Sequence, residues 1–267
     1  MKITLFTSNK ARHIALAEAL AEIADELFVC TEVYTYFVGE VDDCYKKSPI
    51  TAEYFSHVEQ AQEKVFGHPR PFPSSANVMA MRLYDLNRVP LEWMNPLLQS
   101  DLYIVFGASY IKEPLISFLV KNRAINIHAG VSPFYRGHSC NFWAAHDKRS
   151  DLIGSTIHEL TTGLDSGPML LHALPAPQKE DPFLVGMLAV KAAHTAIVEH
   201  IRAGDLLDLP TINQDKSQEL RYTRGVDFTD EIAEKYLQNI PTPEDVYSQM
   251  QNRDISTLHN PFIAQPF

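Results

Sequence analysis

The chain has few cysteines and no excess of basic residues. Its three cysteines, Cys30, Cys44 and Cys140, show neither the spacing of a metal-binding motif nor the pattern of a disulfide framework. Asp and Glu number 33 against 23 Lys and Arg, so the net charge is −10. Surfaces that bind nucleic-acid backbones need an excess of Lys and Arg. We therefore expect no nucleic-acid partner and no resident metal.

Long apolar runs are also scarce. The apolar run near the N-terminus is too short for a signal sequence. No stretch has the length and apolar character that we expect of a membrane span. With 45% hydrophobic residues, the 267-residue chain has the composition of an ordinary globular protein. We expect a soluble, cytoplasmic protein that does not bind a membrane.

The order of predicted elements indicates an α/β fold. Residues 2–7 and 27–35 are predicted strands, and residues 11–27 are a predicted helix, which together make a parallel βαβ unit. Further strands are expected at 101–109, 125–129 and 155–160, and further helices at 51–66, 111–122 and 139–148. This alternation predicts a Rossmann-like, mostly parallel sheet with helices on both faces.

One long helix has clear boundary signals. Asp181 followed by Pro182 predicts its start, and Gly204 predicts its end. Residues 80–99 are expected to be helical in part, although they contain two prolines.

The chain is expected to divide near the end of this helix. Residues 1–205 form the predicted catalytic domain, and residues 206–267 a C-terminal extension. The extension is predicted to hold an extended arm at 220–228, two short helices and a tail at 260–267.

Three polar side chains stand at the ends of predicted strands. Asn126 and His128 belong to one strand, and Asp165 follows the strand at 155–160 in a turn rich in Gly and Asp. Open α/β folds build active sites at such strand ends, so these groups could converge on one acyl centre. An isolated Asn-x-His pair is more often structural, and the flanking sequence has to decide between the two interpretations.

The sequence from Asp101 to Leu170 resembles the folate-dependent formyltransferases. The matching segments are Asn126-Ile127-His128, Pro133-Phe134-Tyr135-Arg136-Gly137, Gly154-Ser155-Thr156-Ile157-His158 and Asp165-Ser166-Gly167. Many members carry Ser two positions after the His, where this chain has Gly130. The chain is most similar to the short sugar N-formyltransferases, of the type that acts on GDP-perosamine.

The resemblance implies transfer of a formyl group from N10-formyltetrahydrofolate to an amine, without a metal. Asn126 would donate an N–H to the oxyanion that develops on the formyl group. His128 would donate as well or take part in proton transfer. Asp165 would orient His128 and accept a proton from the attacking amine. His158 is expected to be a core histidine or a neighbour of the site.

The resemblance also places the folate beside the strand that ends near Gly107. The expected folate-binding residues are Phe106, Ala108, Tyr110, Ile111, Thr161 and Leu164. Plain core packing is an equally good explanation for Tyr110 and Ile111.

The acceptor is expected to be a nucleotide-linked amino-dideoxy sugar, such as GDP-perosamine, used for O-antigen or lipopolysaccharide biosynthesis. Candidate contacts for its phosphates and base are Ser8, Asn9, Arg12, Arg82, Tyr84, Arg88, Tyr222 and Arg224. Tyr84 and Arg88 would share one helix face if residues 80–99 were helical. The turn Thr7–Lys10 contains no glycine, so a close backbone cradle for phosphate is doubtful.

Other functions stay open at this point. The acceptor could be glycinamide ribonucleotide or methionyl-tRNA, or water in a formyltetrahydrofolate hydrolase. A folate- or nucleotide-binding module without activity is the alternative that is not an enzyme. A homodimer is a further hypothesis, based on aromatic residues near the C-terminus.

Overall fold

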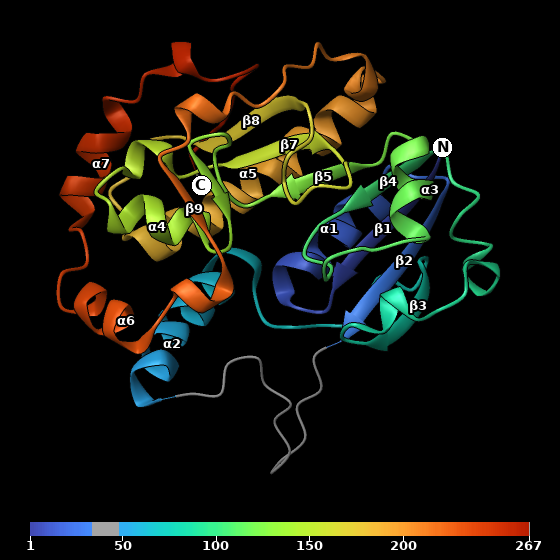
Figure 1. The fold of residues 1–267 in the computed structure, drawn as a ribbon, viewed down its shortest axis with the longest axis horizontal. Helices are drawn as coiled ribbons and strands as arrows, with labels where there is room; N and C mark the ends of the chain where they lie inside the picture. The colour runs from blue at the N-terminus through green and yellow to red at the C-terminus, as the bar shows by residue number, and fades with distance from the viewer. Residues whose placement is uncertain (34–47, 267) are drawn as a thin grey trace.

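The computed structural model describes residues 1–33 and 48–266. Within these residues a central eight-stranded sheet has helices on both of its faces (Figure 1). In spatial order its strands are β10 (Phe262–Ala264), β8 (Met169–Pro175), β7 (Ser155–Glu159), β5 (Ile125–His128), β4 (Leu102–Val105), β1 (Lys2–Ser8), β2 (Glu26–Val33) and β3 (Asn77–Arg82). Neighbouring strands are parallel, except that β7 runs antiparallel to both of its neighbours. The predicted mostly parallel α/β sheet is confirmed.

The predicted βαβ unit opens the fold. β1 and β2 pair in parallel from Lys2 opposite Glu26 to Ser8 opposite Glu32, and α1 (Ala11–Ala21) joins them. Six of the seven residues of β1 are buried, because helices cover both of its faces. The end of the predicted second strand, residues 34 and 35, and Cys44 lie outside the described residues.

Helices on the two faces contact alternate side chains of β1. Ile3 and Leu5 belong to one apolar cluster with α1 and α5 (Pro182–Ala203), while Phe6 belongs to a second cluster with α3 (Leu115–Lys121) on the opposite face. α2 (Pro49–Phe66) packs against α1 and α5. These two layers leave the carboxyl ends of the parallel strands as one edge of the sheet, where a site can form.

Helix α5 has the predicted boundaries. The Asp181 side chain accepts hydrogen bonds from the N–H groups of Phe183 and Leu184, and Gly204 ends the helix with a φ of 75°. By length and composition α5 could cross a membrane, so the expectation that no stretch is long and apolar enough was wrong. Its most apolar window is 61% buried, because α5 is the long core helix that covers the sheet.

The segment 80–99, predicted to be helical in part, begins as a strand and contains no α-helix, only 3-10 helix. Residues 77–82 form β3, which pairs in parallel with β2, and only the short 3-10 turns Asp85–Asn87 and Leu91–Met94 follow. Tyr84 has a left-handed φ of 72° before the first turn, so it shares no helix face with Arg88. The partner strand β2 decides the conformation here, and a local pattern does not show it.

The C-terminal segment is joined to the rest of the fold at both of its strands. β9 (Arg221–Thr223) pairs with β6 (Tyr135–Gly137), which precedes α4 (Cys140–His146). The predicted short helices are present as α6 (Asp230–Leu237) and α7 (Pro243–Gln251). The predicted tail is wrong, because residues 262–264 pair with β8 as the edge strand of the main sheet. The division of the chain at residue 205 stays a prediction.

Candidate active site

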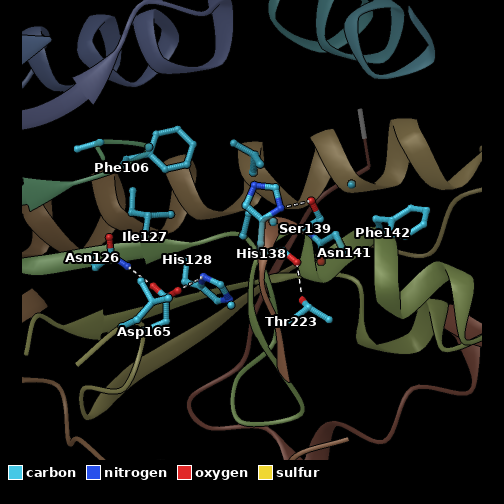
Figure 2. A pocket seen from close by; sticks show the side chains of 18 of the residues that line it. Phe106, Asn126, Ile127, His128, His138, Ser139, Asn141, Phe142, Asp165 and Thr223 are labelled. Carbon is cyan, nitrogen blue, oxygen red and sulfur yellow. Dashed lines mark hydrogen bonds and ion pairs between the residues drawn. The ribbon is translucent and has the colours of Figure 1, made fainter. Parts of the chain in front are cut away.

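The three polar residues singled out in the sequence lie together at one wall of a pocket of about 680 Å³. Asn126 and His128 point to the same side of β5, because alternate residues of a strand share a face. The loop between β7 and β8 brings Asp165 back over this face (Figure 2). Residues far apart in the chain thus form one cluster at the centre of the fold.

The Asp165 carboxylate lies between the other two side chains. Its Oδ1 accepts a hydrogen bond from Asn126 Nδ2 at 3.1 Å, and its Oδ2 lies 3.4 Å from His128 Nδ1 (Figure 2). The side chain of Asp165 is 13% exposed. Oδ1 also lies 3.8 Å from His158 Nε2, so both oxygens of the carboxylate have partners and little water surrounds it.

His158 completes the cluster from the neighbouring strand. It stands opposite Asn126 in the pairing of β5 with β7, and its Nε2 lies 3.0 Å from Asn126 Nδ2. Its Nδ1 lies 2.8 Å from the carbonyl oxygen of Glu159. A carbonyl can only accept, so Nδ1 carries the proton and Nε2 accepts from the amide.

Both N–H groups of Asn126 consequently have partners, Asp165 and His158. The expected donation from Asn126 to an oxyanion thus requires one of these two bonds to be exchanged. The bond to Asp165 is the one that can change, since a carboxylate that takes up a proton becomes a weaker acceptor.

The charges in the cluster favour a neutral imidazole beside a carboxylate. Burial lowers the pKa of His128, and the negative charge of Asp165 offsets this only in part. Burial alone would raise the pKa of Asp165, but His128, His158 and Arg136 outweigh it, so the pKa lies below its ordinary value. Near neutral pH we therefore place the charge on Asp165 and leave His128 neutral.

The far nitrogen of His128 faces the one position that departs from the sequence pattern. His128 Nε2 is buried and has no hydrogen-bond partner among the described residues. A Cβ atom on Gly130 would lie 2.8 Å from this nitrogen and 2.4 Å from the Cβ of Cys140. Cys140 therefore occupies the space that a serine at position 130 would need.

All six residues predicted to bind folate line the pocket. Figure 2 shows Phe106 on the same side as Ile127, above the polar cluster. The residues in question are Phe106, Ala108, Tyr110, Ile111, Thr161 and Leu164. Phe106 and Ile111 are buried, whereas Tyr110 is 53% exposed and donates its hydroxyl to the carbonyl of Thr162 at 3.0 Å. Their role as folate contacts stays a prediction.

The loop that carries four of these residues is fixed by a buried carboxylate. Glu32, 1% exposed at the end of β2, accepts from the N–H and the hydroxyl of Ser109, at 2.7 and 2.9 Å. It also accepts from the N–H of Tyr84 at 2.7 Å. The side chain of Asn87 bonds the carbonyl of Tyr110 and the N–H of Lys112, both at 2.8 Å. Sequence reasoning missed Glu32, although a Glu inside an apolar strand pattern was a usable signal.

The predicted acceptor contacts are only partly brought together. Arg12 and Arg224 line the pocket. Ser8 is buried and Asn9 half-buried in the turn before α1, and neither belongs to the lining. Arg82, Tyr84 and Arg88 lie on β3 and its following turn, also outside the lining, and Arg88 pairs with Asp85. Tyr222 is exposed, with Arg136 5.9 Å from its ring centre.

Other residues in the lining were not predicted. They include an aromatic group from α2, α4 and α5, namely Tyr54, Phe55, Phe142 and Phe183. His138 and Thr223 face each other across β6 and β9, where the Thr223 hydroxyl donates to the His138 carbonyl at 2.7 Å (Figure 2). The strand pairing that brings Thr223 here has no local signal in the sequence. The described residues include no group of three or more His, Cys, Asp or Glu side chains placed to hold a metal.

Comparisons with known proteins agree with this architecture. No family model matches the chain. A methionyl-tRNA formyltransferase from Synechococcus sp. (strain JA-3-3Ab) is 30% identical over 117 residues, 42% of this chain and 36% of that protein. The chain thus spans about a third of the length of the curated relatives it matches.

Two solved structures superpose on nearly the whole fold. A sugar N-formyltransferase from a Shewanella species shares 16% identity at a TM-score of 0.52, covering 100% of this chain and 94% of that one. The chain has the formyltransferase fold. A phosphoribosylglycinamide formyltransferase from Anaplasma phagocytophilum shares 16% identity at a TM-score of 0.51, covering 84% of this chain and 98% of that one. The match to the first structure therefore includes the C-terminal segment, whereas the match to the second covers less of the chain.

Proposed function

We propose that the protein is an N-formyltransferase that moves a formyl group from N10-formyltetrahydrofolate to the amine of a nucleotide-linked amino sugar. One observation carries the proposal: Asn126, His128 and Asp165 converge within hydrogen-bond range at the wall of a pocket of about 680 Å³. A pocket of this size holds a ligand as large as a folate or a sugar nucleotide.

The residues present fit a folate. The apolar wall with Phe106, Ile111 and Leu164 suits a flat aromatic ring system, and the fixed loop from Gly107 to Lys112 offers backbone groups to its edge. The folate would supply the formyl group. The protein would supply orientation, a dry surrounding and the groups that move protons.

Asp165 is the group in the proposed reaction that takes the proton from the attacking amine. It is ionised and 13% exposed, and it borders the pocket. Proton uptake weakens its bond to Asn126, so an Asn126 N–H becomes available to the negative charge on the transferred formyl oxygen. The bond between formyl carbon and N10 then breaks, and the proton returns from Asp165 to N10, directly or through His128 or a water. One N–C bond forms, one breaks, and no nucleophilic side chain is needed.

Two observations support a sugar nucleotide as the acceptor. Arg12 and Arg224 border the pocket and suit a diphosphate, while Tyr54 and Phe142 offer apolar ring faces. The net charge of −10 disfavours a tRNA. Within this class GDP-perosamine is our first candidate, and formylated sugars of that kind belong to O-antigen and lipopolysaccharide biosynthesis in the cytoplasm.

The test is a panel of acceptors incubated with the protein and N10-formyltetrahydrofolate, followed by mass spectrometry. We expect one added formyl group on a nucleotide amino sugar. Formylation of glycinamide ribonucleotide or methionyl-tRNA alone would overturn the acceptor. Consumption of N10-formyltetrahydrofolate at the same rate with and without an acceptor would indicate a hydrolase. Tight binding of both ligands in calorimetry without turnover would indicate a binding module.

A further inference from the structure

The loop that presents Asp165 has an unfavourable backbone conformation. Asp165 has a φ of 44°, in the left-handed region that side chains other than glycine rarely adopt. Within the loop, the hydroxyls of Thr161 and Ser166 lie 3.0 Å apart. A residue held in this region persists only when its surroundings hold it there, so the contacts from outside the loop are decisive.

Gln214 provides the most direct of these contacts. Its Nε2 donates to the carbonyl oxygen of Asp165 at 2.8 Å and to that of Gly167 at 3.0 Å. Two carbonyl acceptors fix the orientation of the amide, because its oxygen could not face them. Gln214 therefore ties both sides of the turn that holds Asp165 in place.

Neighbouring contacts bring Gln214 to this position. Ile212 and Met169 exchange both backbone hydrogen bonds, at 2.8 and 3.1 Å, so the chain before Gln214 runs antiparallel to the end of the loop. On the other side, Arg136 pairs with Glu219 at 2.9 Å and reaches the carbonyl of Leu164. The segment 212–219 thus holds the loop along its length.

We propose that Gln214 is a positioning residue for Asp165, acting through the two backbone carbonyls that it binds. The inference rests on the proposed function, in which Asp165 is the proton acceptor. Gln214 touches no reacting atom. Its loss would let the turn relax and move the carboxylate away from Asn126 and His128.

The surroundings of Asp165 set the direction of the expected change. The ionisable groups that face it are His128 on β5, His158 on β7, Arg136 on β6 and Cys140 on α4. The two histidines and Arg136 lower the pKa of Asp165, and Asp165 in turn raises that of His128. Burial is the largest influence and raises the pKa of Asp165, so a carboxylate that is displaced but still buried would titrate at higher pH, and His128 would titrate at lower pH.

The test compares Gln214→Ala and Gln214→Met with the control Gln218→Ala. Gln218 lies four residues away on the exposed surface, where its side chain donates to Asp215 at 3.2 Å. We expect kcat to fall about 10- to 100-fold in both Gln214 variants, as for a small misplacement of a catalytic group. KM for the folate should change little, and the acid limb of the kcat–pH profile should move to higher pH. The control should match the wild type.

A second measurement does not depend on activity. The imidazole of His128, followed by NMR in the folded protein, should titrate at lower pH in Gln214→Ala than in the wild type. If the wild type transfers no formyl group, the proposed function is wrong, but the His128 titration still tests whether Gln214 positions Asp165. Unchanged kcat, acid limb and His128 titration in folded Gln214 variants would overturn the inference. Loss of folding in Gln214→Ala leaves Gln214→Met, which keeps the length of the side chain without its donor or a charge, to decide.

Discussion

His172 is buried between two parts of the chain that the sequence places far apart. Its Nε2 donates to the carbonyl of Ser132 at 2.7 Å, and its Nδ1 accepts from the N–H of His259 at 2.9 Å. The first partner belongs to the turn after β5, and the second precedes β10. The neutral imidazole satisfies both bonds, whereas a protonated one would lose the acceptor for His259.

Acid should therefore weaken the fold through this residue. Burial lowers the pKa of His172 from 6.5 to about 4. The unfolded chain thus binds the proton at a higher pH than the folded protein does. Stability is complete above pH 6.5 and falls as the pH drops from there to about 4. Each pH unit in this window is worth about 1.4 kcal/mol, so the loss is about 3 kcal/mol.

The measurement is urea unfolding of the wild type and of His172→Gln at a series of pH values from 7 to 4. Glutamine has a donor and an acceptor but lacks the rigid ring that aims them at the Ser132 carbonyl and the His259 N–H, so the variant should be about 1–3 kcal/mol less stable at pH 7. Toward pH 4 the wild type should lose about 3 kcal/mol that the variant keeps, so the stabilities of the two proteins should meet or cross. His13 and His194 are also buried and lose stability in acid, but they do so in both proteins. A difference that stays constant with pH would refute the reasoning.

Three further predictions concern the site and its supports. Asn126→Ala and His128→Ala should keep the circular dichroism of the wild type but lower formyl-transfer kcat by about 10²–10³-fold, and normal turnover would exclude the assigned roles. Glu32→Gln loses the charge that binds Ser109 and should raise KM for the folate more than it changes kcat, measured in steady-state kinetics, with Glu26→Gln at the half-buried start of β2, where it pairs with Lys2, as control. Gly137→Ala should lower the free energy of unfolding by more than about 1 kcal/mol, since φ is 91° and a Cβ would lie 2.0 Å from the Thr223 oxygen. Gly186→Ala, whose Cβ would meet Asn141 only at 4.0 Å, should be neutral or stabilising in the same urea titration.

Local signals in the sequence predicted the elements that local physics controls. The N-cap Asp181, the following proline and the final Gly204 define α5 without reference to anything outside it. The strand, helix, strand start was visible for the same reason, because apolar periodicity and crossover length are local. The three residues of the candidate site were predicted from their motifs, and the structure brings their side chains together.

The misses have a common physical cause, which is pairing between distant segments. β3 and β10 are strands because β2 and β8 offer them unpaired edges, and neither edge is encoded near residues 77–82 or 262–264. The contact between Gln214 and the turn of Asp165 could not be predicted from the sequence for a related reason. Gln214 binds backbone carbonyls, which every residue has, so nothing at Asp165 marks its partner 49 positions away.

These distant pairings change how the C-terminal segment relates to the site. Thr223 and Arg224 line the pocket because β9 pairs with β6, and Gln214 holds the turn of Asp165. Arg253 donates to the carbonyls of Asp151, Ile153 and Pro175, which fastens the end of α7 to the sheet. The C-terminal segment thus contributes to the pocket wall, to the turn that holds Asp165 and to the main sheet. Residues on both sides of position 205 therefore line the same pocket.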